Sequence, residues 1–134
     1  MKTIYRVLIC AALMGALAFA QVPRYPRTVS FTIAAGGSLS AGVDLKGCTL
    51  ARMELPTITS AAITFAVSED GGTYKELYDF YGSAVAYPAS TGGVIVALSP
   101  GDWFGLKFLK VRSGTAASAV TQAGGAVIKF TCKD

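Results

Sequence analysis

The chain has 134 residues, which is the size of a single domain, and it carries 12 Lys and Arg against 8 Asp and Glu. It contains no histidine, and this excludes a serine–histidine–acid triad and any zinc site built on histidine. Lys2 and Arg6 supply two of the positive charges, so the balance beyond residue 20 is 10 − 8 = +2. The sequence therefore indicates no specific nucleic acid, or other strong polyanion, as a partner.

Residues 1–20 have the layout of a secretory signal peptide. Lys2 and Arg6 precede an uncharged apolar run from Val7 to Leu17, and Ala18-Phe19-Ala20 offers a small-x-small cleavage site. The apolar run is shorter than the ~20 residues that a membrane-spanning helix needs, so no permanent membrane span is expected. The sequence predicts a short hydrophobic leader helix that is cleaved on export, and an uncleaved anchor or a packed N-terminal helix is the alternative.

Residues 21–27, QVPRYPR, are predicted to form an extended arm. Its two prolines lack the backbone N–H that an interior strand must donate. Val22 and Tyr25 give the arm apolar side chains to bury, and Arg24 and Arg27 give it charges to pair. We therefore expect the arm to pack on a neighbouring subunit rather than on its own core.

Residues 28–134 are predicted to form one all-β domain, because apolar and polar residues alternate between turn signals spaced every ~8 to 12 residues. The expected strands are 28–34, 39–45, 48–55, 63–67, 74–78, 85–87, 94–98, 106–112 and 126–133. A single helical turn is expected near Trp103-Phe104. The pattern favours an antiparallel, jelly-roll-like β-sandwich of about eight strands.

The clearest element is a β-hairpin in the middle of the chain. Ile63, Phe65 and Val67 alternate on one face, Glu69-Asp70-Gly71-Gly72 supplies the turn, and Tyr74 to Tyr78 returns as the second strand.

The acidic residues in and after this hairpin do not indicate an enzyme. Neither Glu69 and Asp70 nor Glu76 and Asp79 have the geometry that a pair of glycosidase carboxylates requires. A calcium loop needs about six or more ligands, so the first pair is interpreted as part of a turn. We expect no catalytic residue, no metal site and no cofactor.

Cys48 and Cys132 are the two cysteines that follow the leader. In an oxidising compartment an even pair is typical of a disulfide, which here closes a loop of over eighty residues. Two buried free thiols are the alternative for a protein that folds in the cytosol.

Two groups of surface side chains are further candidates. Lys110 and Arg112 share one strand face, Lys129 and Lys133 share another, and neighbouring strands would join them into a basic stripe for anionic lipid, glycan or DNA; otherwise they only solvate a sheet face. Aromatic residues near the loops either anchor an interface or cover an end of the sandwich; they are Tyr81, Tyr87, Trp103 and Phe104.

Several short motifs resemble those of known families. The Ser68-Glu69-Asp70-Gly71 hairpin, Thr73-Tyr74 and the strand Phe108 to Arg112 are similar to discoidin or coagulation-factor C-type jelly rolls. A closer resemblance is to small accessory structural proteins of tailed phages, over residues 38–130. The motifs that carry it are Leu55-Pro56, Thr64-Phe65, Ser68 to Tyr74, Leu77 to Asp79, Leu98 to Pro100 and Phe108 to Thr115. They describe strands and turns, so the resemblance implies a fold and a place in a virion rather than a reaction.

Three functional hypotheses follow. The first is a non-enzymatic accessory or decoration protein of a phage virion, which docks on capsid, neck or tail subunits as a homo-oligomer or within a larger assembly. The second is a secreted or cell-surface discoidin-like module that binds glycan or lipid. The third is a subunit of an extracellular filament joined by strand exchange through the arm.

Overall fold

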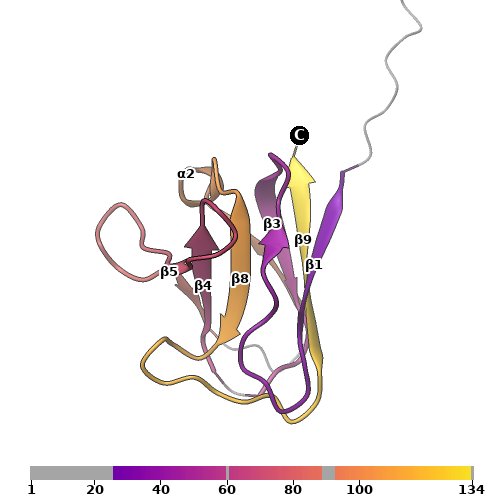
Figure 1. Ribbon diagram of the computed structural model, residues 1–134. Coiled ribbons are helices and arrows are strands. Elements are labelled where there is room, and N and C mark those ends of the chain that lie inside the picture. The colour runs from indigo at the N-terminus through magenta and orange to yellow at the C-terminus, as the bar shows by residue number, and fades with distance from the viewer. Residues whose placement is uncertain (1–25, 60, 89–92, 134) are drawn as a thin grey trace, which may run out of the picture.

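The structure, a computed structural model, describes residues 26–59, 61–88 and 93–133 (Figure 1). In this part of the chain nine strands form two antiparallel sheets that face each other. The first sheet has the order β1 (Thr28–Ile33), β9 (Ala126–Lys133), β3 (Thr49–Leu55) and β7 (Val94–Ala97). The second has the order β2 (Val43–Asp44), β8 (Phe108–Ser113), β4 (Ile63–Ser68) and β5 (Lys75–Glu76), and β6 (Ala86–Tyr87) also pairs with β4. The predicted antiparallel β-sandwich is confirmed, and the predicted leader lies outside the described residues.

The core lies between the two sheets, because alternate residues of each strand point inward. In β9 the inward residues Ile128 and Phe130 are fully buried, while Val127 and Lys129 between them are exposed. β4 differs, since its outward residues Thr64 and Ala66 are buried as well. On that face, Arg112 lies opposite Thr64 and Glu76 lies opposite Ala66, and these two flanking residues form an ion pair. The hydroxyl of Thr64 also donates a hydrogen bond of 2.7 Å to the carbonyl of Gly114.

The expected strand over residues 39–45 is shorter in the structure. Only Val43–Asp44 pairs with β8, and Leu39 makes a single bridge to that strand. Between them, the side chain of Ser40 takes part in the ladder, because its hydroxyl accepts a hydrogen bond of 2.9 Å from the N–H of Val111. A side-chain hydroxyl that bonds to the backbone competes with regular strand pairing, and the period-2 pattern does not reveal this.

A one-turn helix, α2 (Pro100–Trp103), follows β7 where the sequence predicts a helical turn. It places the indole of Trp103 inside the sandwich, fully buried. The Trp103 ring lies 4.7 Å from the ring of Phe65 and 5.9 Å from that of Phe130, measured between centroids. Trp103 therefore closes the core at this end of the molecule. Among the described residues, no helix has the length and apolar character that crossing a membrane requires.

Candidate functional site

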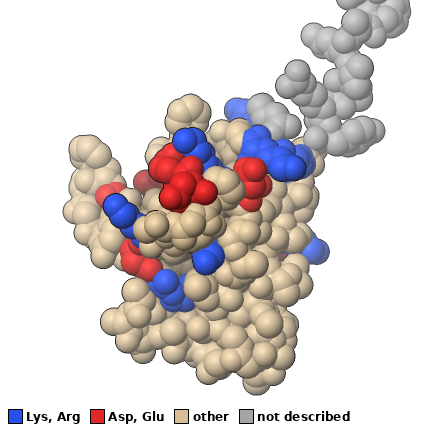
Figure 2. All heavy atoms as spheres, in the orientation of Figure 1, with Lys and Arg blue, Asp and Glu red and all other residues tan. Residues whose placement is uncertain are grey.

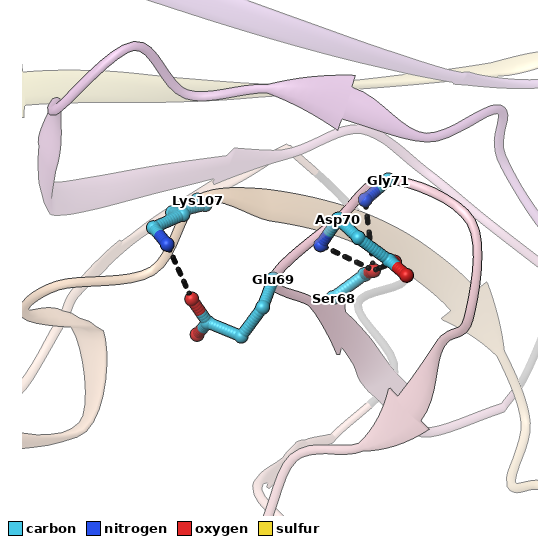
Figure 3. A network of polar contacts seen from close by, with 5 residues as sticks. All are labelled: Ser68, Glu69, Asp70, Gly71 and Lys107. Atoms are coloured by element: carbon cyan, nitrogen blue, oxygen red, sulfur yellow. Dashed lines mark hydrogen bonds and ion pairs between the residues drawn. The ribbon is translucent and has the colours of Figure 1, made fainter.

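The turn between β4 and β5 is held by side-chain hydrogen bonds around Asp70 (Figure 3). The Oδ1 atom of Asp70 accepts hydrogen bonds from the N–H groups of Gly72 and Thr73, at 2.8 and 3.0 Å. The hydroxyl of Ser68 donates to the same oxygen at 2.8 Å and accepts from the N–H of Gly71 at 3.0 Å. Gly71 has φ +75°, a conformation that glycine adopts without strain. The turn is therefore rigid although it is exposed.

These hydrogen bonds favour the charged form of the carboxylate. The bond from Ser68, followed by those from the two backbone N–H groups, lowers the pKa of Asp70 from 3.8 to about 2. Beside it, Glu69 forms an ion pair of 2.9 Å with Lys107, which comes from the segment before β8 (Figure 3). Hydrogen bonding to Glu69 raises the pKa of Lys107.

A hollow of about 320 Å³ lies beside this turn. We call it the Ser68 hollow, and its lining residues are Val67, Ser68, Glu69, Asp70, Thr73 and Lys75. Most of its lining surface is apolar, and the polar groups of Ser68, Glu69 and Asp70 already bond to other residues of the chain. Among the described residues, no three His, Cys, Asp or Glu side chains lie close enough together to hold a metal ion. Sequence reasoning treated these residues only as a turn and missed the hollow, because its shape depends on how the turn folds back beside Lys75.

Replacing Asp70 by asparagine is expected to remove a contribution to stability that depends on pH. Because the pKa of Asp70 is lowered from 3.8 to about 2, its carboxylate stabilises the fold fully above about pH 4, and this contribution is lost as the pH falls through about 2. Urea unfolding of wild type and Asp70→Asn, from about pH 6 to about pH 2, measures the difference. We expect a gap in stability at the upper pH that closes toward the lower; a gap independent of pH would contradict the assignment.

The segment between β5 and β6 forms a second turn, which stands out from the sandwich at the left of Figure 1. Asp79 organises it: its Oδ1 atom accepts hydrogen bonds from the N–H groups of Tyr81 and Ser83, at 2.9 and 2.8 Å. The N–H of Asp79 donates to the carbonyl of Ser83 at 2.8 Å, and Gly82 takes φ +79°. Tyr78 and Ala84 pair across the base.

This turn exposes three aromatic side chains, which we call the aromatic tip: Tyr78, Phe80 and Tyr81. Phe80 is 94% exposed and Tyr81 is 89% exposed. Their rings pack edge to face on each other, with centroids 5.6 Å apart and an angle of 81° between the planes. Large aromatic side chains are usually buried, so the exposure of both rings on this turn is unusual. Tyr81 is one of the interface candidates from the sequence, whereas Phe80 and Tyr78 were missed.

The other aromatic candidates divide between core and surface. Trp103 is wrong as an interface residue, because α2 turns its indole into the core. Tyr87 is half-buried and stacks on Trp103 at 6.5 Å between centroids, so it belongs to the same cluster. Phe104 directly follows α2 and is 77% exposed.

The basic stripe does not exist in the structure. Lys110 and Arg112 lie on β8 in the second sheet, whereas Lys129 and Lys133 lie on β9 in the first, so the outward faces of these strands point away from each other. Each face is also mixed in charge, since Arg112 pairs with Glu76 and Lys129 lies 3.9 Å from Glu54. Figure 2 shows acidic and basic side chains interleaved on the visible face.

Lys110 makes a cation–π contact within the domain. Its ammonium lies 4.0 Å from the centre of the Tyr74 ring, over the outer face of the second sheet. The hydroxyl of the same tyrosine packs tightly against Gly42, where an added Cβ atom would lie 2.0 Å from it. The long side chain of Lys110 therefore packs on Tyr74.

The predicted arm is described only at its end. Val22, Arg24 and Tyr25 lie outside the described residues. Arg27 is half-buried and bonds to its own domain: its carbonyl accepts a hydrogen bond of 2.7 Å from the N–H of Cys132, and its guanidinium donates to the carbonyl of Leu45. Its role at an interface stays a prediction.

Cys48 and Cys132 form a disulfide in the structure, as the sequence analysis expects for an exported chain, with their Cα atoms 5.4 Å apart. Both side chains are buried. The bond ties the start of β3 to the end of β9, two strands that are already neighbours in the first sheet. It therefore reinforces the edge of the core nearest Arg27 and does not join distant parts of the fold.

No protein-family model and no curated protein matches this chain. Among solved structures, its fold is similar to that of the SPBc2 prophage-derived protein YomS, with 17% sequence identity and a TM-score of 0.45 over 83% of this chain and 96% of that one. It is also similar to CBM32-1 from a family 31 glycoside hydrolase of Clostridium perfringens, with 15% identity and a TM-score of 0.45 over 87% of this chain and 99% of that one. Similarity at this level concerns the arrangement of strands only.

Proposed function

We propose that this chain is a non-catalytic accessory protein of a phage virion, and that it docks on another subunit through the aromatic tip. One observation carries the proposal: Phe80 and Tyr81 are almost fully exposed on a turn that Asp79 holds rigid. A preorganised pair of aromatic rings loses little conformational freedom on binding. The entropy cost that opposes the burial of its apolar area is therefore small. The motif resemblance over residues 38–130 supports the virion as the place of assembly.

The double variant Phe80→Ser, Tyr81→Ser is expected to weaken attachment to purified virus particles by at least about 30-fold, because even a single interface hot spot contributes about 2 kcal/mol or more. Both side chains are exposed, so the urea midpoint of the isolated variant should match that of wild type. Co-sedimentation of tagged protein with particles that lack the endogenous copy measures attachment.

Phe104→Ser is the matched variant, since it removes an exposed phenylalanine outside the tip. It should attach as wild type does. Attachment of the double variant at wild-type strength would contradict the role of the tip. Absence of the wild-type protein from purified particles would contradict the virion proposal as a whole.

A second candidate function is a secreted module that binds glycan, and the Ser68 hollow favours it. A hollow with a largely apolar wall beside the Thr73 hydroxyl and the Lys75 ammonium group suits a sugar, which presents an apolar ring face together with hydroxyls. Lys75→Ala would remove glycan binding and leave attachment to particles unchanged, so this variant separates the two functions.

A further inference from the structure

β7 is an edge strand of the first sheet, and its free edge is apolar. The strand reads Val-Ile-Val-Ala; Ile95 is 68% exposed and Val94 is 42% exposed. Proteins usually protect such an edge with a charged side chain, a proline or a bulge. Residues 94–97 contain no charge and no proline, and their pairing with β3 is regular. Among the described strands, none lies along the other side of β7.

The direction of the backbone groups on β7 follows from its pairing with β3. The N–H of Leu98 donates a hydrogen bond of 3.0 Å to the carbonyl of Ala51 on β3. Backbone groups alternate in direction along a strand, so Val94, Val96 and Leu98 direct theirs toward β3. The N–H and C=O groups of Ile95 and Ala97 therefore point toward the free edge.

We propose that this edge pairs antiparallel with β7 of a second copy of the chain, across a two-fold axis at Val96. Ile95 then lies opposite the partner's Ala97, and Ala97 lies opposite the partner's Ile95. Each of these pairs exchanges two backbone hydrogen bonds. The two four-stranded sheets become one continuous eight-stranded sheet, and the interface is isologous, as in most dimers.

A second copy fits this edge because the strand is complementary to itself. A two-fold axis at Val96 brings outward-pointing backbone groups together, whereas an axis midway between Ile95 and Val96 would pair outward groups with inward ones. With the axis at Val96, the pairing between the two copies extends to Leu98, which lies opposite the partner's Val94. Leu98 still has strand geometry, because its N–H continues the hydrogen-bond ladder with β3. On the core side, Val96 meets its own copy and Val94 meets the partner's Leu98, so every contact in that row is apolar.

The charges beside the seam are also compatible with self-pairing. On the outer face of β3, Glu54 stands next to Ile95 and Arg52 stands next to Ala97. In the dimer, a line across the two β7 strands passes from Glu54 through Ile95 and the partner's Ala97 to the partner's Arg52, and the two-fold axis generates a second such line. The two charges that flank the seam are therefore opposite in sign in both lines, and no like charges face each other.

Ile95→Pro tests the proposal, because the N–H that proline removes points to the seam and not to β3. Sedimentation velocity of the full-length chain should give the mass of two chains for wild type and the mass of one for this variant. Ile95→Lys, which places a charge on the edge, should have the same effect. Val127→Lys is the matched control: it makes the same kind of change at an exposed residue on the outer face of β9, which is flanked by β1 and β3. It should remain dimeric.

A cross-link tests the register directly. Val96 and its copy form a non-hydrogen-bonded pair at the axis, with Cα atoms about 4.5 Å apart, which is within the range of a disulfide. Oxidised Val96→Cys should migrate as a covalent dimer, and Ala97→Cys should not, because Ala97 lies opposite the partner's Ile95.

A wild-type chain that sediments as a monomer would overturn the proposal, and so would an Ile95→Lys variant that stays dimeric. If Ile95→Pro loses its near-UV circular dichroism, the decision rests on Ile95→Lys and on the cross-link. The proposal is independent of the aromatic tip, since Phe80→Ser, Tyr81→Ser should leave the dimer intact.

Discussion

Replacing Phe65 by alanine is expected to lower the free energy of unfolding by about 3 to 5 kcal/mol. Phe65 is fully buried in β4, and its ring packs edge to face on Trp103, Tyr87 and Phe130, with centroid distances of 4.7, 6.0 and 6.3 Å. The substitution removes apolar contact with all three rings and leaves a cavity where the two sheets meet. Urea unfolding at neutral pH measures the change.

Phe104→Ala is the control, because it is the same substitution at a side chain that is 77% exposed. It should change the free energy of unfolding by less than about 0.5 kcal/mol. A loss below about 1 kcal/mol for Phe65→Ala would mean that the core closes around the missing ring, against the usual behaviour of such sites.

Removal of the disulfide is expected to lower stability by about 4 to 5 kcal/mol. Cys48 and Cys132 are separated by 84 residues, and opening so long a loop increases the conformational freedom of the unfolded chain. Urea unfolding of the double variant Cys48→Ala, Cys132→Ala, beside wild type with and without reductant, measures the effect.

Reduced wild type and the double alanine variant should unfold at similar urea concentrations, well below oxidised wild type. Reductant should not affect the double variant, which controls for effects of the reductant itself. Equal midpoints for oxidised and reduced wild type would contradict the prediction.

Local patterns in the sequence predict much of this fold. The alternation of Ile63, Phe65 and Val67, followed by Glu69-Asp70-Gly71-Gly72, predicts a hairpin that the structure contains as β4 and β5. Ala126–Lys133 is a strand at its predicted bounds. The residues that define these elements lie close together in the sequence, so a single sequence is enough to predict them.

Features that depend on which strands meet could not be predicted. The basic stripe required β8 and β9 to be neighbours, and the period of each strand does not say which sheet it joins. Trp103 was ambiguous for a similar reason: whether an aromatic residue after a Pro-Gly turn points inward depends on where the sheets lie relative to that turn. The exposure of Phe80 depends on the shape of its turn, in which Asp79 accepts hydrogen bonds from the N–H groups of Tyr81 and Ser83, and on where that turn leaves the sandwich.

The position of β9 has a consequence for the order of events during synthesis. It comes last among the described strands, yet it lies in the interior of the first sheet, between β1, the first of them, and β3. Its 8 residues supply the pairing partner of both neighbours, and Cys132 as well. Until β9 has been synthesised, β1 therefore has no strand that connects it to the β3–β7 pair. A chain without β9 would keep only the β3–β7 pair of this sheet, so the first sheet is completed only after β9 has been synthesised.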